Sequence, residues 1–183
     1  MGSAFAWLGQ IFDAMLQFFP RRVIVRATHG GVKWTWRGGV KELKPGVRFY
    51  WPLLSDIELI VTARQTVNTR TQALVTKDGK QVAVGGVVVY SIGDVVQSIG
   101  KLNFDPIDTV GDISQAAIVK VITSLLYEEI VSGISTTVEE ALTHSCRKSL
   151  RQYGVYVHRA AITDFAPSRT FNLLGVQGAS VFN

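Results

Sequence analysis

The stretch that most constrains the fold is residues 76–92, TKDGKQVAVGGVVVYSI, in which a polar turn cluster leads into a strand. Five apolar residues recur there at every second or fourth position, on one face of an extended chain: Val82, Val84, Val88, Tyr90 and Ile92. Because Val87 and Val89 make the opposite face apolar too, we expect both faces of this central strand to be covered. Gly85 and Gly86 predict a bulge or a close backbone approach in its middle.

The residues before this strand alternate between strand-forming runs and turn signals. Residues 22–28 and 32–37 predict two short strands joined by the His-Gly-Gly sequence at 29–31, which gives a hairpin. Trp34 and Trp36 would then share one face. Three further strands of the same sheet are expected at 47–52, 56–63 and 66–74.

Helical patterns follow Gly93. A short helix is expected at 94–102, a long apolar helix at 112–131 and another helix after Gly133.

The last of these helices carries its own start and stop signals. Thr136 and Glu139 match a capping box, and Gly154 suits the position just beyond the C-terminal end. Residues 155–165 return as a strand. The sequence therefore predicts an α+β fold, a sheet with helices to one side.

The N-terminal residues 3–19, SAFAWLGQIFDAMLQFF, have the pattern of an amphipathic helix. Gln10, Asp13 and Gln17 form a narrow polar stripe opposite a wide apolar one, and Pro20 ends the helix. The residues expected to bind a membrane are Phe5, Trp7, Leu8, Ile11, Phe12, Met15, Leu16, Phe18, Phe19, Arg21 and Arg22.

This helix is expected to lie in the plane of a membrane. Seventeen residues reach roughly 25 Å, which is less than the hydrocarbon core of about 30 Å. Asp13 at the centre of a spanning helix would cost about 2.5–3.5 kcal/mol, whereas an in-plane helix can turn it toward the headgroups. The alternative is a helix that packs on the protein's own core or on a neighbouring subunit.

The positive charge lies next to this segment. Residues 20–80 carry twelve Lys or Arg and four Asp or Glu, whereas residues 81–183 carry seven and nine. Four tryptophans also lie in the first third of the chain, and tryptophan favours the membrane–water interface, although for any single tryptophan core packing is the more usual explanation. This distribution fits an anionic membrane surface better than it fits nucleic acid.

Three segments carry a family resemblance. The Thr-Lys-Asp-Gly turn at 76–79 leads into alternating valines and Tyr90. Upstream, KPGVRFYWPL at 44–53 holds a Pro-Gly…Phe…Pro stretch, and downstream, residues 152–165 run from QYGVYV to ITDF. These segments, which span roughly residues 22–165, resemble the SPFH or band 7 superfamily of stomatins, prohibitins, flotillins and bacterial relatives.

The resemblance and the local patterns together predict the organisation of the chain. We expect an N-terminal membrane-anchoring amphipathic helix (1–20), an SPFH/band 7-like domain (21–165, with a strand-rich part at 22–92, a helical part at 93–154 and a closing strand at 155–165) and a C-terminal tail (166–183). Relatives usually continue into a coiled coil, but no heptads follow Phe165, so we expect a short form that lacks it. Oligomerisation is assigned to the apolar tail residues Phe171, Leu173, Leu174 and Val176.

What the resemblance implies about function is a membrane-associated, self-assembling scaffold. It would organise a membrane patch or a partner membrane protein, with its SPFH domain on the cytoplasmic side. The implied partners are anionic membrane lipids, further copies of the chain and a client membrane protein, and no nucleic acid is expected.

No pattern in the sequence indicates catalysis. Cys146 is the single cysteine, and His29, His144 and His158 are not at metal-ligand spacing. We expect no catalytic residue, no metal and no cofactor, and therefore no enzyme. Two other functions remain open: an assembly subunit of a shell, virion or secretion complex whose N-terminal helix binds a partner, and, with less support, a nucleic-acid-binding module.

Overall fold

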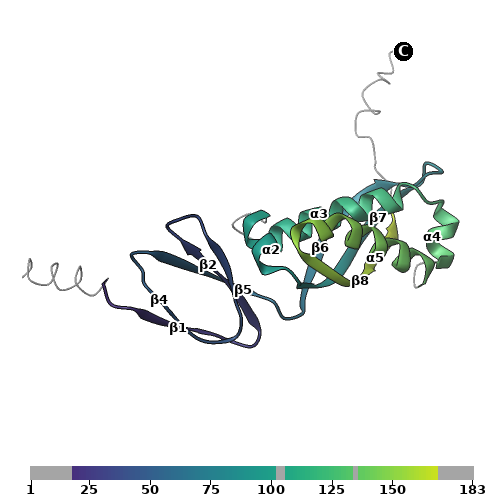
Figure 1. Cartoon of the computed structure of the whole chain (residues 1–183). Helices are drawn as coiled ribbons and strands as arrows, with labels where there is room; N and C mark the ends of the chain where they lie inside the picture. Colours follow the sequence, from purple (N-terminus) through teal and green to yellow (C-terminus); the bar gives the residue numbers. More distant parts are fainter. Residues whose placement is uncertain (1–17, 102–105, 134–135, 169–183) are drawn as a thin grey trace, which may run out of the picture.

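The computed structural model describes residues 18–101, 106–133 and 136–168, and it has the predicted α+β fold. Its elements form two units arranged along one long axis (Figure 1). A strand-rich N-terminal part leads into a helical part that ends in a strand, as expected. The helix expected within residues 1–20 falls almost wholly outside the described residues.

The first unit, which we call the N-terminal β unit, covers residues 21–61. Two of its strands pair antiparallel as β1-β4, and the other three form an antiparallel sheet in the order β3-β2-β5. Its strands are β1 (Arg21–Val25), β2 (His29–Thr35), β3 (Val40–Leu43), β4 (Gly46–Tyr50) and β5 (Ser55–Val61).

The prediction that β1 and β2 pair as a hairpin is wrong. β1 pairs with β4, and the turn after β1 closes where the His29 N–H donates to the Arg26 carbonyl at 2.9 Å. Gly30 and Gly31 lie inside β2 because they allow close packing. A Cβ at Gly30 would lie 2.5 Å from a methyl of Val95 on the following unit.

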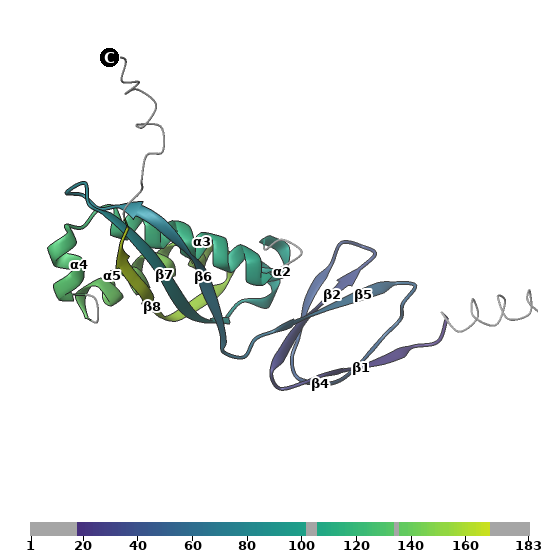
Figure 2. The same ribbon diagram turned by 180° about the vertical axis from the view of Figure 1, so that it is seen from behind.

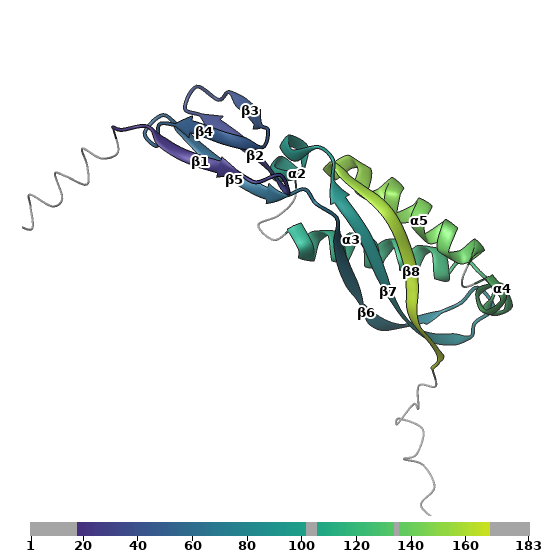
Figure 3. The same cartoon turned by 90° about the horizontal axis from the view of Figure 1, so that it is seen from below.

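The second unit, the sheet–helix unit, covers residues 65–167. Its antiparallel sheet has the order β6-β7-β8 (Figure 3). The expectation that β6 continues the sheet of β5 is therefore wrong. The elements are β6 (Gln65–Val75), β7 (Gln81–Ile92), α2 (Val95–Lys101), α3 (Pro106–Ile122), α4 (Tyr127–Gly133), α5 (Thr137–Leu150), the short 3-10 helix η1 (Arg151–Tyr153) and β8 (Val155–Pro167).

β7 is the central strand, and its predicted inner face is buried. Val82, Val84, Val88, Tyr90 and Ile92 are all at most 6% exposed. The pairing with β8 shifts register between Gly85 and Gly86, which confirms the predicted bulge. The opposite face of β7 was expected to be covered as well, but no described element packs over it. Val87 and Val89 are half-buried there, and Figure 2 shows that face of the sheet without a helix.

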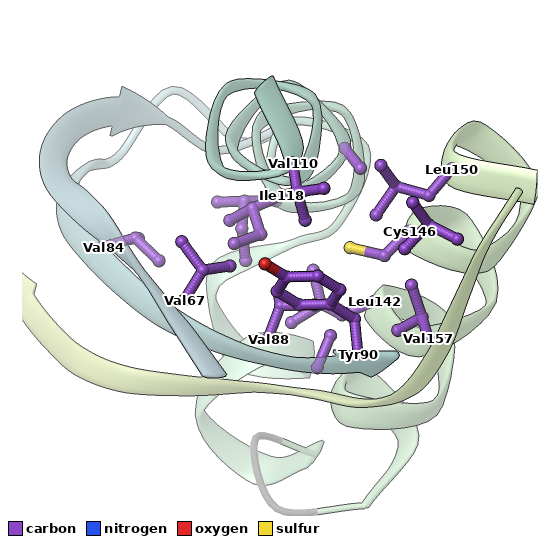
Figure 4. Close-up of a cluster of buried hydrophobic side chains, with 14 of the residues drawn as sticks. Val67, Val84, Val88, Tyr90, Val110, Ile118, Leu142, Cys146, Leu150 and Val157 are labelled. Atoms are coloured by element: carbon purple, nitrogen blue, oxygen red, sulfur yellow. The ribbon is translucent and has the colours of Figure 1, made fainter. Parts of the chain in front are cut away.

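Helices α3 and α5 cover the inner face of this sheet. Figure 4 shows Tyr90 at the centre of the resulting core, surrounded by side chains of α3, α5 and β8. Leu142 and Cys146 on α5 are fully buried against it. Cys146 is therefore a core residue of this unit.

The single helix expected at 112–131 is instead two helices. α3 begins earlier and ends at Ile122, where the hydroxyls of Thr123 and Ser124 bond to the carbonyls of Val119 and Val121 at 2.8 and 2.7 Å. Such side-chain bonds compete with the helical backbone ladder. The chain then turns into α4.

The prediction of a capping box formed by Thr136 and Glu139 is also wrong, because Glu139 has another partner. The Thr136 side chain makes no capping bond, and both Glu139 oxygens accept hydrogen bonds from the Arg159 guanidinium on β8. Further along α5, Thr143 bonds to the Ala160 backbone, and Arg147 donates to the Val157 carbonyl. Helix α5 thereby satisfies three backbone groups on the outer edge of β8, part of what would otherwise be an open sheet edge.

The turn between β6 and β7 is held to the start of α4. Thr76 is buried, with its hydroxyl 2.6 Å from an Asp78 carboxylate oxygen, which also accepts the Tyr127 N–H at 3.1 Å. The Lys80 ammonium lies 4.6 Å from the centre of the Tyr127 ring. The Thr-Lys-Asp-Gly turn therefore joins the sheet to the helices.

Replacing Thr76 with valine is expected to lower the free energy of unfolding by about 1–3 kcal/mol, because the buried Thr76 hydroxyl loses its hydrogen bonds to the Asp78 carboxylate and to the Lys80 backbone. The Thr76 hydrogen bond also holds the pKa of Asp78 below its ordinary value. Asp78 thus stabilises the fold above that ordinary pKa and loses its contribution as the pH falls, so the variant should be less sensitive to acid. Urea denaturation at several pH values measures both effects.

The matched control is Thr66→Val, which removes an exposed hydroxyl from β6. Its expected effect is within about 0.5 kcal/mol. Equal losses for the two variants would contradict a joining role for the Thr76 turn.

Candidate membrane-contact surface

Exposed apolar side chains are concentrated in and just before the N-terminal β unit. Among the described residues, twelve of the large hydrophobic side chains that are exposed lie between Phe18 and Val61, and five lie between Val75 and Tyr156. The buried hydrophobic side chains of residues 18–61 are Val25, Val32 and Leu43. Large exposed apolar areas mark contact with a partner or a membrane.

Two turns meet at the end of this unit where β1 begins. The Trp36 N–H, in the turn between β2 and β3, donates to the Leu54 carbonyl, in the turn between β4 and β5, at 3.0 Å. We call the exposed apolar side chains at these turns and at the adjoining end of β4 the aromatic tip: Trp36, Phe49, Trp51, Leu53 and Leu54.

A cleft of about 670 Å³ lies at this tip. Its apolar walls include Trp36, Phe49 and Trp51, and its cations are Lys33 and Arg37. The Arg37 guanidinium carbon lies 5.8 Å from the centre of the Trp36 ring. The cleft thus combines an aromatic surface with positive charge.

The structure places four of the predicted membrane-binding residues at this same end. Phe18 and Phe19 are 68% and 63% exposed, and Arg21 and Arg22 are exposed at the start of β1. Pro20, between them, lines the cleft. The remaining predicted residues lie outside the described part of the chain: Phe5, Trp7, Leu8, Ile11, Phe12, Met15 and Leu16, and in the tail Phe171, Leu173, Leu174 and Val176.

The whole fold, with this surface, can be compared with known families. The family model described as SPFH domain / Band 7 family matches residues 23–173. This chain belongs to the SPFH/band 7 family. The resemblance noted in its sequence is confirmed, and members of the family are often membrane-associated scaffolds and are generally not enzymes. No curated protein matches the chain.

The aromatic tip of this SPFH chain was missed as a site by sequence reasoning. The clustering of tryptophans was the available signal, but the sequence placed Trp34 and Trp36 on one face. In the structure, Trp34 packs against the core, whereas Trp36 lies beyond the end of β2 and is 74% exposed. Which tryptophan is exposed depends on where the strand ends.

Cys146 and His158 of this SPFH fold have pKa values that are shifted by their structural surroundings. Burial raises the pKa of the Cys146 thiol to about 11, so the thiol is protonated near neutral pH and is a poor nucleophile. His158 bonds to the Ser91 hydroxyl at 2.9 Å, and burial, with Arg64 and Arg147 nearby, lowers its pKa. Within the described residues, no three His, Cys, Asp or Glu side chains are grouped to hold a metal ion.

The described helices of this SPFH chain differ from membrane spans in length or in hydropathy. None of them is by itself both long enough and apolar enough to cross a membrane. α3 and α4 meet that criterion only when joined, and the chain bends by 115° between them.

Proposed function

We propose that this SPFH chain is a membrane-associated, self-assembling scaffold, held on the cytoplasmic side of a membrane by residues 1–20. The observation that carries the proposal is the exposed pair Phe18 and Phe19, followed directly by exposed Arg21 and Arg22. This pair continues the amphipathic pattern of the preceding residues into the described fold. Family membership supports the same role.

The physical basis is the combination of apolar burial with charge. Aromatic side chains gain free energy when they enter the headgroup–acyl boundary, and each arginine near an anionic surface adds about 1 kcal/mol of attraction. An in-plane helix needs no apolar stretch long enough to span the bilayer. The sheet–helix unit then remains on the aqueous side, free to bind other proteins.

Self-assembly and a client membrane protein are further parts of the proposal. The half-buried face of β7 at Val87 and Val89 is an apolar surface that a second copy or a client can cover. The tail residues Phe171, Leu173, Leu174 and Val176 are the other proposed contact between copies.

Flotation with vesicles tests the membrane role. The full chain is expected to float with vesicles that contain phosphatidylglycerol, and deletion of residues 1–20 is expected to weaken binding roughly a hundredfold, since both the apolar stripe and its interfacial position are lost. Circular dichroism checks that the shortened chain is folded.

The matched control replaces two exposed apolar residues that lie outside the candidate membrane-contact surface. Phe18→Gln with Phe19→Gln should weaken flotation, whereas Val131→Gln with Tyr156→Gln should not, because these two are exposed on α4 and β8. A full chain that stays in the aqueous fraction would refute the membrane role. A defined oligomer in buffer, seen by light scattering, together with that result would favour the assembly-subunit alternative.

A further inference from the structure

The cleft at the aromatic tip is not explained by an anchor in residues 1–20. We propose that it is a binding site for an anionic phospholipid, with the phosphate held by Lys33 and Arg37 and the start of the acyl chains held by the aromatic walls. This inference rests on the proposed membrane role. It adds a second, lipid-selective contact that belongs to the folded part of the chain.

The cleft is a formed site because backbone bonds hold its walls. The Trp36 N–H bonds to the Leu54 carbonyl at 3.0 Å, and the Ser55 N–H and hydroxyl both bond to the Trp51 carbonyl, at 2.9 and 3.0 Å. On the other side, the Thr35 N–H and hydroxyl bond to the Gly39 carbonyl, at 2.9 and 3.0 Å. Its volume of about 670 Å³ is in the range of small-molecule sites.

The charge of the cleft favours an anion. Lys33 and Arg37 line it, and no Asp or Glu is among its described lining residues. Neither cation forms a salt bridge to an acid in the described part of the chain. An arginine fork suits a phosphate group, which it can bind through two parallel hydrogen bonds.

The apolar half of the cleft favours an amphiphilic ligand. Trp36 is 74% exposed, and Phe49 and Trp51 are also exposed beside it. Aromatic rings with a polar edge are favoured at the boundary between headgroups and acyl chains. A free phosphate ion would satisfy the cations and leave these rings in water, whereas a phospholipid satisfies both.

The N-terminal segment of the chain itself fits less well. Residues 1–17 carry one acidic side chain, Asp13, whereas four cations lie at the cleft or beside it: Arg21, Arg22, Lys33 and Arg37. Pro20 lines the cleft, so a segment anchored in a membrane just before it would bring the cleft to headgroup level. Charge and position therefore both favour lipid.

Binding to vesicles by a charge-matched pair of variants tests this site. Lys33→Gln with Arg37→Gln is compared with Lys148→Gln with Arg151→Gln, which removes two exposed cations from the C-terminal end of α5 and the start of η1. We expect the first variant to bind phosphatidylglycerol vesicles roughly tenfold more weakly and phosphatidylcholine vesicles unchanged. The second variant should change binding less than about twofold, because its cations do not line the cleft.

The outcomes separate this inference from the proposed function. If the unmodified chain binds no vesicles, both are overturned. If it binds and the two variants lose affinity equally, the membrane role stands and the cleft assignment is overturned. Inorganic phosphate should not displace the chain from vesicles, and displacement by phosphate alone would overturn the assignment to a lipid.

A fluorescent label then locates the contact. Leu53→Cys at the tip and Val131→Cys on α4 have similar exposure, 57% and 50%, and the buried Cys146 should not react. Brominated phosphatidylglycerol should quench the label at position 53 and leave the label at position 131 unchanged. No quenching at position 53 would show that the tip does not meet lipid. Protection of that label from an aqueous quencher before vesicles are added would show that another segment covers the tip. Either result would overturn the proposal.

Discussion

Replacing Tyr90 with alanine is expected to lower the free energy of unfolding by about 3–5 kcal/mol. Tyr90 is 1% exposed and packs between Leu142 and Cys146 of α5 and Val157 of β8 (Figure 4). The truncation leaves a cavity that the strand and the helix cannot both move to fill. Urea denaturation, followed by far-ultraviolet circular dichroism, measures the loss.

This loss is a large share of the 5–15 kcal/mol that typical domains possess. The control is Tyr156→Ala, which removes a 52% exposed ring on the adjoining strand and should cost less than about 1 kcal/mol. A Tyr90 variant as stable as the Tyr156 variant would mean that the sheet and helices are not held together at this point.

Replacing Gly154 with alanine is expected to cost about 3 kcal/mol or more. Gly154 has a φ of +72°, and a Cβ there would lie 2.5 Å from the Asp94 carbonyl oxygen. Its own carbonyl accepts the N–H groups of Gly93 and Asp94, at 2.9 and 3.1 Å. The added methyl therefore strains the backbone and displaces the turn before α2, which breaks hydrogen bonds worth about 1 kcal/mol each.

Gly38 provides a matched control for the strain alone. Its φ is +78°, but no atom lies within 4 Å of a Cβ added there. Gly38→Ala should cost only the backbone term of about 1–2 kcal/mol. The difference between the two variants, measured by thermal or urea unfolding, reports the close approach at Gly154, and equal values would contradict it.

Local patterns predicted the parts of the fold that depend on local geometry. The period of two in β7 identified its buried face, from Val82 to Ile92, because alternate side chains of a strand point the same way in any fold. Gly154 was recognised at the end of the last helix because a left-handed residue is needed there.

Features that depend on distant partners were not predicted. The glycines of β2 suggested a turn, but Gly31 makes room for Leu59 of β5, and Gly30 makes room for Val95, which lies more than sixty residues further along the chain. Glu139 matched a capping pattern, yet Arg159 on β8 is its partner. In both cases a local signal was satisfied by a tertiary contact.

The candidate site divides in the same way. Phe18, Phe19 and the two arginines after Pro20 could be proposed from helical spacing and charge alone. The cleft could not, because Lys33, Trp36 and Trp51 come from different turns and strands that meet only when the Trp36 N–H reaches the Leu54 carbonyl.

The sequence by itself thus determined the α+β class, the family, the buried face of β7 and the apolar, basic character of the N-terminal end. The tertiary structure alone decided the pairing of β1 with β4, the half-buried second face of β7 and the cleft at the aromatic tip. The reason is physical: side-chain periodicity and turn geometry act over a few residues, whereas pairing and clefts depend on which distant segments pack together.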